Sequence, residues 1–287
     1  MLCNHHAHTR FSDGVGEPSD YALRALRQGF DSYTFSDHAP IPLDGAGSMP
    51  MDELSAYVAE TERLREAYAG RLNIYRSLEV DYLPGIMNVN SRHIREAELD
   101  FTVGAVHYVD TLADGVPWSF QRPEPVFAEG IDSIFSGNAR SMVERYYALV
   151  REMVTDHPPD IVAHLDRIKK RNERERYWSE SEDWYRRAVE ETLDAIQQAG
   201  IIMEVNTRGL YLHEITDTYP SRWIVERAHH RGIPLQINSD AHRAEHISGG
   251  FPEAYRMLEE IGVESVRVFR DGGFTEIPVQ EFHRQNA

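Results

Sequence analysis

Residues 1–14 read MLCNHHAHTRFSDG and place three histidines, His5, His6 and His8, on what the pattern indicates is the first strand. Side chains at positions i and i+2 of a strand point to the same face, so His6 and His8 lie together and His5 points the other way. Two imidazoles on one face suit a metal ion. An HxH pair also occurs as ordinary surface histidines, so the rest of the chain has to decide between the two interpretations.

Composition places the chain among globular proteins with a sizeable core. It has 287 residues, of which 41% are hydrophobic and 10% aromatic. The single cysteine, Cys3, excludes an internal disulfide framework and fits a reducing compartment, so we expect a cytoplasmic protein. No apolar run approaches the roughly 20 residues of a membrane span, and no membrane association is expected. Without internal repeats or low-complexity linkers, residues 1–287 are expected to form a single domain.

The charge balance is strongly acidic, with 30 basic and 47 acidic residues and a formal net charge of −17. A general nucleic-acid binder needs a basic face, so no nucleic-acid partner is expected. A small phosphorylated substrate remains compatible with this charge, because bound divalent cations and a few arginines reverse the potential locally.

Short apolar or β-branched runs alternate along the chain with amphipathic stretches that predict helices. The predicted strands are Leu2–His8, Ser32–His38, Asn73–Tyr82, Phe101–Val109, Asp160–Asp166, Ile201–Arg208 and Pro234–His242. The predicted helices are Pro18–Gln28, Met51–Ala69, Ala139–Thr155, Glu182–Ala199, Pro220–Arg231 and Pro252–Ile261. Alternation of this kind indicates an α/β fold with parallel strands, and seven of them favour a barrel over an open sheet.

Each predicted strand ends in polar or metal-capable side chains. They are His6 and His8; Ser36, Asp37 and His38; Glu79 and Asp81; His107; His164 and Asp166; Glu204, Asn206 and Arg208; Asp240 and His242. The carboxyl ends of the strands meet on the active-site face of a parallel barrel. A lone His107 or His164 is more often a hydrogen-bonded core residue, but here the same residue types recur at several strand ends. Burying them together without a cation costs many kcal/mol, so we expect a metal cluster.

Eight motifs occur in order over residues 4–242: HAHTRFSDG, GFDSYTFSDHAP, SLEVDYLPG, GAVHYVD, VAHLDRIKKRN, MEVNTRGLY, YPS and NSDAH. In this the chain resembles the polymerase-and-histidinol-phosphatase (PHP) superfamily, and within it the monofunctional histidinol-phosphate phosphatases. The resemblance implies a distorted seven-stranded (β/α)7 barrel that holds three divalent metal ions.

The same resemblance implies a ligand set for the three ions. His6, His8, Glu79 and Asp240 would hold the first; Glu79 would bridge to the second, completed by His107 and His164; Asp13, His38 and His242 would hold the third. Some superfamily members have a histidine where Asp13 stands, and Asp13 also fits a simple turn residue. The mixed nitrogen and oxygen ligands fit zinc, iron or manganese better than magnesium or calcium.

The implied activity is hydrolysis of L-histidinol phosphate to L-histidinol and phosphate, with a metal-bridging hydroxide as the nucleophile. The leaving alkoxide needs a proton, for which Asp240, His242 and a water on the third ion are the candidates. Two alternatives stay open: a phosphoesterase of this family acting on another small phosphomonoester or a nucleotide, and a non-catalytic regulatory domain. The second requires missing ligands, and all nine matching positions are filled.

A phosphate monoester also calls for a forked cationic partner. Arg208 lies two positions after Asn206 at a strand end, so its side chain is expected to point to the same inner face, and it is the leading candidate for phosphate binding. Arg167, Lys169 and Arg243 are second choices. Any of these is also compatible with an ordinary solvent-exposed side chain. The segment Asp110–Asn138 is long for a connection, and it fits a lid over the site or ordinary loop packing equally well.

Overall fold

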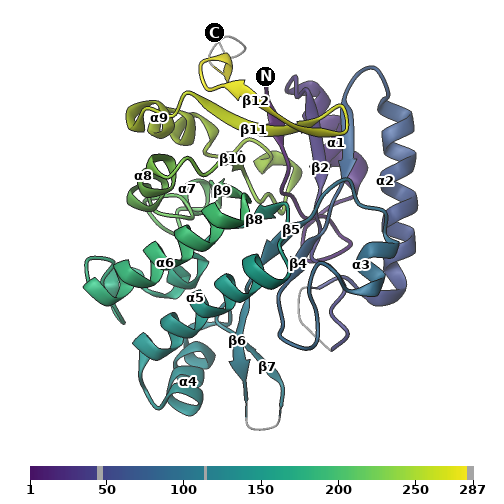
Figure 1. Cartoon of the computed structure of the whole chain (residues 1–287). Coiled ribbons are helices and arrows are strands. Elements are labelled where there is room, and N and C mark those ends of the chain that lie inside the picture. Colours follow the sequence, from purple (N-terminus) through teal and green to yellow (C-terminus); the bar gives the residue numbers. More distant parts are fainter. Residues whose placement is uncertain (44–47, 113–114, 283–287) are drawn as a thin grey trace.

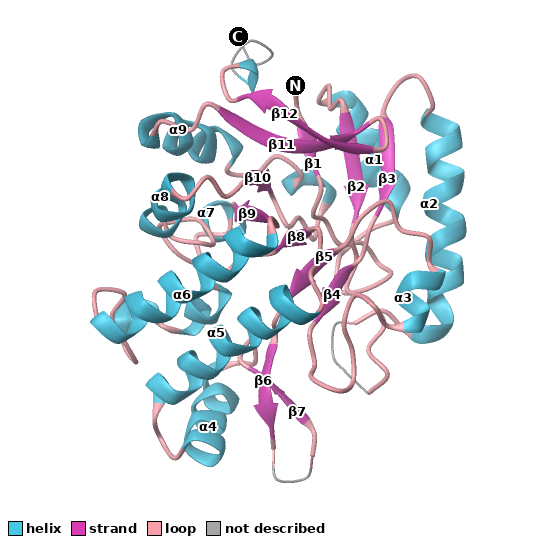
Figure 2. Cartoon of the chain, viewed as in Figure 1, coloured by secondary structure: helices cyan, strands magenta, loops and turns pink. Residues whose placement is uncertain are grey.

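The structure is a computed structural model that describes residues 1–43, 48–112 and 115–282 (Figure 1). Its parallel strands fall into two sheets at the centre of the molecule, with helices around them (Figure 2). One sheet has the order β1 (Cys3–Asn4), β2 (Ser32–Phe35), β3 (Asn73–Arg76). The other has the order β10 (Leu235–Asn238), β9 (Ile202–Asn206), β8 (Ile161–Val162), β5 (Val103–Ala105), β4 (Glu79–Asp81).

Isolated parallel bridges connect the two sheets at two places. Ala7, beyond β1, pairs with Ala241, beyond β10, and the His8 amide donates to the Ala241 carbonyl at 2.8 Å. On the other side His38, beyond β2, pairs with Glu79 in β4. These bridges lie at the carboxyl ends of the strands, where the predicted site residues are found.

The helices are amphipathic and pack on the sheets through their apolar faces. They are α1 (Pro18–Arg27), α2 (Leu54–Tyr68), α3 (Arg92–Glu96), α4 (Glu124–Phe135), α5 (Ala139–Asp156), α6 (Asp183–Ala199), α7 (Arg208–Tyr211), α8 (Arg222–His230) and α9 (Phe251–Ile261), with short 3₁₀ helices at η1 (Met51–Glu53), η2 (Arg167–Arg171), η3 (Glu173–Glu175) and η4 (Ala244–His246). In α6, for example, Tyr185, Val189, Leu193 and Ile196 recur at helical spacing and are all buried. Within the described residues no helix is long and apolar enough to cross a membrane.

All seven predicted strands contain strand structure, but most are shorter than predicted. The run Asn73–Tyr82 divides into β3 and β4, and Phe101–Val109 divides into β5 and β6 (Tyr108–Thr111). β6 forms an antiparallel hairpin with β7 (Pro117–Ser119), which the sequence pattern did not predict, and α4 was also missed. Several strands end just before site residues: β5 ends at Ala105, and His107, two positions further on, is buried.

A second unpredicted hairpin, β11 (Ser265–Arg270) with β12 (Gly273–Pro278), crosses the opposite end of the molecule from β6 and β7 (Figure 1). Its Phe269 is buried in an apolar cluster with Phe101, Val103, Ala105, Ile161, Ala163 and Ile202. The Phe269 amide donates to Nε2 of His5 at 3.1 Å. The hairpin therefore covers the amino ends of the strands and leaves the carboxyl ends for the site.

Candidate metal centre

The carboxyl ends of the strands converge on one cluster of histidines and carboxylates. His6 and His8 follow β1, His38 follows β2, His107 follows β5 and His164 follows β8. Glu79 opens β4, Asp240 and His242 follow β10, and Asp13 lies on the turn beyond His8. The structure thus brings together all nine residues that were predicted as metal ligands.

Four overlapping groups in this cluster place metal-ligand atoms within 4.8 Å of one another. The groups are His8, Asp13, His38 and His242; His6, Glu79 and His164; His6, His8 and Asp240; and His38, Glu79 and His107. Because the groups share His6, His8, His38 and Glu79, they form one continuous centre.

Glu79 lies at the middle of this centre and is buried. Its Oε1 is 2.8 Å from Nε2 of His164, and its Oε2 is 2.9 Å from Nδ1 of His38. Nε2 of His6 and Nε2 of His8 are each 3.5 Å from the same Oε2. Each carboxylate oxygen therefore faces a different part of the centre, as a bridging ligand requires.

Asp240 closes the centre on the β10 side. Its Oδ1 is buried without a hydrogen-bond partner among the described residues, and it lies 3.2 Å from Nε2 of His8. Its backbone has a positive φ of 51°, a conformation that non-glycine residues adopt rarely and that recurs at functional sites.

Asp13 is more exposed than the rest and stands at the rim. Its Oδ2 is 3.1 Å from Nε2 of His242, and its Oδ1 is 3.6 Å from Nδ1 of His8. Buried Asp37 holds the turn in place by accepting hydrogen bonds from the backbone amides of Thr9 and Ser12 at 2.7 and 3.1 Å. Gly14 is required there, because a Cβ atom would lie 2.1 Å from the His8 carbonyl oxygen.

The donor set fits divalent transition-metal ions. Nε2 of His6 and Nε2 of His8 face each other at 3.1 Å, and each also faces the carboxylates of Glu79 and Asp240. Nδ1 of His8, which faces Asp13, has no hydrogen-bond partner among the described residues. Imidazole nitrogens and carboxylate oxygens that converge in this way are the ligands that such an ion binds.

Electrostatics within the centre are strongly coupled. Burial disfavours the charged form of His38, but Glu79 and Asp13 outweigh burial and raise the pKa of His38 to about 10. Burial, with His242 and His38 nearby, lowers the pKa of His8 to about 3. Burial opposes ionisation of Glu79, yet His38, His6 and His107 hold the pKa of this carboxyl well below its usual range. Glu79 is therefore ionised and available as a ligand.

Of the four predicted phosphate-binding cations, Arg208 lies against the centre. Its Nη1 donates to the Asp240 carbonyl at 2.8 Å and contacts Nδ1 of His242. Arg167 is buried and donates to Glu214 at 3.1 Å, with its guanidinium over the Tyr219 ring.

The other two predicted cations have different partners. Nζ of Lys169 is buried 2.7 Å from Asp166 and donates to the Thr218 carbonyl at 3.2 Å. Arg243 is exposed, 3.9 Å from Glu245. The structure therefore brings neither of these side chains into contact with the metal-capable residues.

A hollow of about 280 Å³ opens beside Asp13, His38 and His107. Its far wall includes Tyr108, Ser119, Gln121, Arg122 and Pro123 from the β6–β7 hairpin and the loop that follows. The individual wall residues were not identified from the sequence, although all but Tyr108 lie in the segment Asp110–Asn138. Ala113 and Asp114 of that segment lie outside the described residues. Glu214, the partner of Arg167, was also missed; its place shortly after the NTRGLY motif was the available signal.

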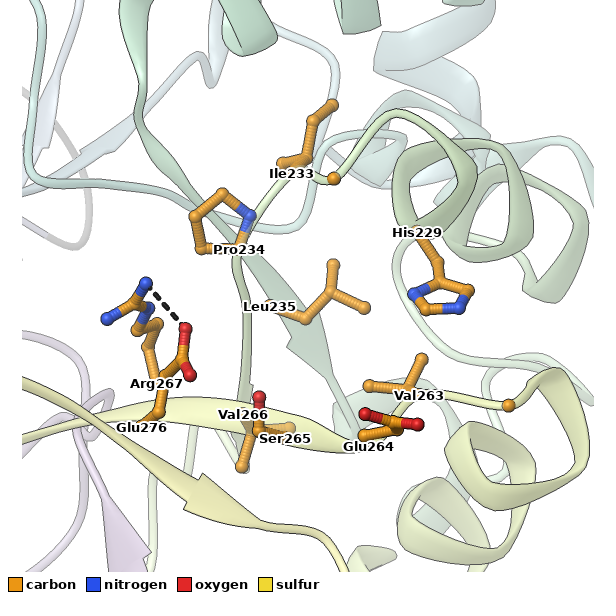
Figure 3. Close-up of a pocket in the computed structure, with 12 residues that line it drawn as sticks. His229, Ile233, Pro234, Leu235, Val263, Glu264, Ser265, Val266, Arg267 and Glu276 are labelled. Carbon is orange, nitrogen blue, oxygen red and sulfur yellow. Dashed lines mark ion pairs between the residues drawn. The ribbon is translucent and has the colours of Figure 1, made fainter.

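Another hollow, of about 390 Å³, lies at the amino end of β10 (Figure 3). Leu235, Val266 and His229 line it, and Arg267 and Glu276 form an ion pair at its edge at 2.8 Å. Asp240 follows the carboxyl end of β10, so this hollow is at the other end of that strand from the metal centre.

Comparison with known proteins agrees with this geometry. The PHP domain family profile matches residues 4–208. The chain is 30% identical over 268 residues to the "Probable histidinol-phosphatase" of Deinococcus radiodurans, covering 92% of this chain and 95% of the relative. It is 29% identical to the histidinol-phosphatase of Bacillus subtilis over 254 residues, 83% of this chain and 92% of that one.

Among solved structures, HisK of Listeria monocytogenes superposes with a TM-score of 0.75 at 22% identity, covering 88% of this chain and 99% of that chain. The histidinol phosphate phosphatase of Lactococcus lactis, complexed with Zn, L-histidinol and phosphate, superposes with a TM-score of 0.69 at 16% identity, covering 96% and 98%. These likenesses show that the α/β fold is shared.

Proposed function

Because this chain belongs to the PHP domain family, we propose that it is a metal-dependent phosphatase that hydrolyses L-histidinol phosphate to L-histidinol and phosphate. The observation that carries the proposal is the buried Glu79 carboxylate, whose two oxygens face His164 and His38 from opposite sides of one continuous centre. The relatives named histidinol-phosphatase, aligned over nearly their whole length, support the choice of substrate.

Three divalent ions, of zinc, iron or manganese, are proposed for the centre. The first set is His6, His8, Glu79 and Asp240; the second is Glu79, His107 and His164; the third is Asp13, His38 and His242. The overlapping groups of ligand atoms support the third set, which lies within one group, and the His6, His8 and Asp240 part of the first. In the second set, His164 and His107 belong to two different groups that share Glu79. When bound, such ions supply Lewis-acid activation of water and charge stabilisation on the phosphoryl oxygens.

The protein side chains have separate tasks in this proposal. Arg208 orients the phosphate through its guanidinium, which already lies beside Asp240 and His242. Burial opposes ionisation of Asp240, but nearby Arg208 and His6 outweigh burial and hold the pKa of this carboxyl well below its usual range. Asp240 would therefore have to take a proton from the attacking water before passing it to the leaving alkoxide. His242 is the alternative proton donor. Arg167, whose guanidinium lies over the Tyr219 ring, remains the second candidate for binding the phosphate. Roles for Lys169 and Arg243 stay predictions from sequence, with their present partners arguing against both.

The hollow beside Asp13, His38 and His107 is proposed to accept the imidazole and amine end of the substrate. Two carboxylates, those of Asp13 and Asp81, line it with one cation, Arg122, and Ser119 and Gln121 offer neutral hydrogen-bonding groups. A cationic amine fits such a wall better than a second phosphate does.

We further propose that residues 1–287 form a single domain and that its sheets close into the seven-stranded barrel. The parallel bridges Ala7–Ala241 and His38–Glu79 support closure, because the first joins the ends of the marginal strands β1 and β10, and the second joins the end of β2 to β4. β3 and β4 come from one predicted run, so the strand order around the ring matches the sequence expectation. A cytoplasmic location stays a prediction.

The deciding experiment compares phosphate release from L-histidinol phosphate with release from a panel of small phosphomonoesters and a nucleoside monophosphate. We expect kcat/KM for L-histidinol phosphate to exceed the others by at least about two orders of magnitude, as expected when a site binds polar substrate groups specifically. A higher kcat/KM for another phosphomonoester or for the nucleotide would make that compound the substrate in place of L-histidinol phosphate. No phosphate release from any of them would overturn the proposal.

A further inference from the structure

We propose that Glu204, in β9, is a positioning residue that sets the tautomer of His6 and the backbone of His164 at once. Both histidines are thereby held with Nε2 directed at the candidate metal centre. The inference rests on the proposed function only in taking that centre as a metal site. Glu204 is fully buried and does not itself belong to any of the four metal-capable groups.

The carboxylate of Glu204 is surrounded by hydrogen-bond donors. Oε1 is 2.7 Å from Nδ1 of His6 and 3.0 Å from Nδ2 of Asn238. Oε2 is 2.8 Å from the backbone amide of His164 and 3.1 Å from Nδ2 of Asn206. An ionised carboxylate only accepts hydrogen bonds, so the arrangement satisfies both of its oxygens.

The orientation of the two asparagine amides is fixed from the other side. Oδ1 of Asn238 accepts from the His5 amide at 2.8 Å, and Oδ1 of Asn206 accepts from the Arg208 amide at 2.9 Å. Their NH2 groups must therefore point at Glu204. Two donors are held in place whatever residue occupies position 204.

The contact with His6 decides which of its ring nitrogens is free. Because Oε1 of Glu204 accepts, Nδ1 of His6 carries the proton and Nε2 keeps its lone pair. Nε2 is the atom that faces Nε2 of His8 and Oε2 of Glu79. With the proton on Nε2 instead, His6 could not bind a metal ion through that atom.

The contact with His164 acts on the backbone. His164 has a positive φ of 25°, outside the regions that most side chains adopt, and its amide is held by Oε2 of Glu204. In this conformation Nε2 of His164 reaches Oε1 of Glu79 at 2.8 Å. One carboxylate thus supports two histidines that are far apart in the sequence.

Glu204→Gln tests the hydrogen-bonding role most directly, because glutamine keeps the shape of the side chain and replaces one hydrogen-bond acceptor by a donor. With its NH2 on the Oε1 side, it faces Asn238 and forces His6 to accept at Nδ1, which moves the proton to Nε2. With its NH2 on the Oε2 side, it faces the His164 amide and the NH2 of Asn206. Either orientation leaves at least one fixed donor opposed by another donor.

A matched control exists at the other end of β8. The exposed carboxylate of Asp160 accepts from the Thr102 amide at 2.7 Å and from its hydroxyl at 2.9 Å, with no histidine involved. Asp160→Asn therefore makes the same carboxylate-to-amide change at a backbone-binding carboxylate without touching the centre.

The test uses the zinc-loaded full chain, labelled with ¹⁵N at histidine. In the parent protein we expect ring-nitrogen NMR shifts that place the His6 proton on Nδ1. In Glu204→Gln we expect a changed His6 tautomer or a shifted His164 amide signal, and zinc affinity, measured against a competing chelator, that falls about 10- to 100-fold. Asp160→Asn should keep the parent zinc affinity and His6 signals.

Two results overturn the inference: a His6 proton on Nε2 in the zinc-loaded parent, or a Glu204→Gln protein with parent-like zinc affinity and histidine signals. The parent spectrum alone tests the tautomer if Glu204→Gln does not fold. A merely structural role would lower the melting temperature without changing zinc affinity in the folded fraction. Failure of the proposed function appears separately, as no phosphate release by the zinc-loaded parent.

Discussion

Oε1 of Glu79 lies 2.8 Å from Nε2 of His164, although 85 positions separate the two residues in the chain. The other oxygen of the same carboxylate meets Nδ1 of His38 at 2.9 Å. Neither contact is local, and both depend on the start of β4 lying at the same level as the residues that follow β2 and β8. The predictions below use this convergence.

Glu79→Gln should lower kcat by several orders of magnitude. The substitution keeps the side-chain shape and removes a charge that the proposed ions share, so activation of water is lost. Steady-state kinetics and metal analysis of the purified protein measure the effect. Glu96→Gln is the control, because this glutamate is exposed and pairs with Arg92 away from the centre. Activity within a few-fold of the parent at saturating metal would rule out a bridging role for Glu79.

Arg208→Ala should reduce kcat/KM by about one to two orders of magnitude, corresponding to the loss of a charge-assisted contact worth roughly 1.5–3 kcal/mol. Metal content should not change, since Arg208 is not a proposed ligand. Arg208→Lys should retain activity only in part, because lysine keeps the positive charge but lacks the planar guanidinium that can donate two hydrogen bonds to one phosphate.

The matched control for Arg208→Ala is Arg63→Ala, which removes an exposed arginine that pairs with Glu60 at 2.7 Å away from the centre. We expect parent-like kinetics from this control. If Arg208→Ala left kcat and KM unaltered, the phosphate contact would have to be reassigned, with Arg167 as the next candidate.

Removing metal with a chelator should abolish phosphate release and lower the melting temperature. Without cations, the buried carboxylates and imidazoles of the centre lose their strongest partners, and an ion that binds only the folded state stabilises it. Adding back zinc, iron or manganese separately, with kinetics and calorimetry after each, identifies the ions that restore both properties. Full activity in a protein shown to be metal-free would contradict the proposed mechanism.

Gly130→Ala should destabilise the protein by about 1–3 kcal/mol, since overpacking outweighs helix propensity here. Alanine favours the interior of α4 by roughly 1 kcal/mol over glycine. A Cβ atom at position 130, however, would lie 2.1 Å from the Trp118 ring, which is buried and cannot move aside cheaply. Urea unfolding measures the change.

Gly273→Ala is the control for that substitution, because a Cβ atom there meets nothing within 4 Å. An unchanged free energy of unfolding in Gly130→Ala would mean that β7 and α4 are not packed as tightly as Trp118 indicates. In that case the β6–β7 hairpin, which forms part of the wall of the hollow beside Asp13, could shift its position.

Much of the centre was predictable because its rules are local. Alternation along a strand predicted that His6 and His8 face the same way, and their Nε2 atoms lie 3.1 Å apart. Strand–helix alternation predicted parallel strands, and parallel strands bring their carboxyl ends to one face. These arguments need only the order and spacing of residues.

Local rules failed for the two hairpins and for α4. β11 and β12 are held by burial of Phe269 against residues from three distant strands, a contact with no local signature. Similarly, Arg208 and Lys169 are both cations close to strand ends, yet one lies beside Asp240 and the other is buried against Asp166. Which partner each cation meets depends on the packing of elements that are remote in sequence.

By itself, then, the sequence determined the class of fold, the family and the residues that converge, because periodicity and motif order are properties of the chain. Only the tertiary structure decided that Glu204 lies against both His6 and His164 and that Oδ1 of Asp240 is buried 3.2 Å from Nε2 of His8. Hydrogen bonds act over about 3 Å, and atoms from separate strands reach that distance only after the whole sheet has formed.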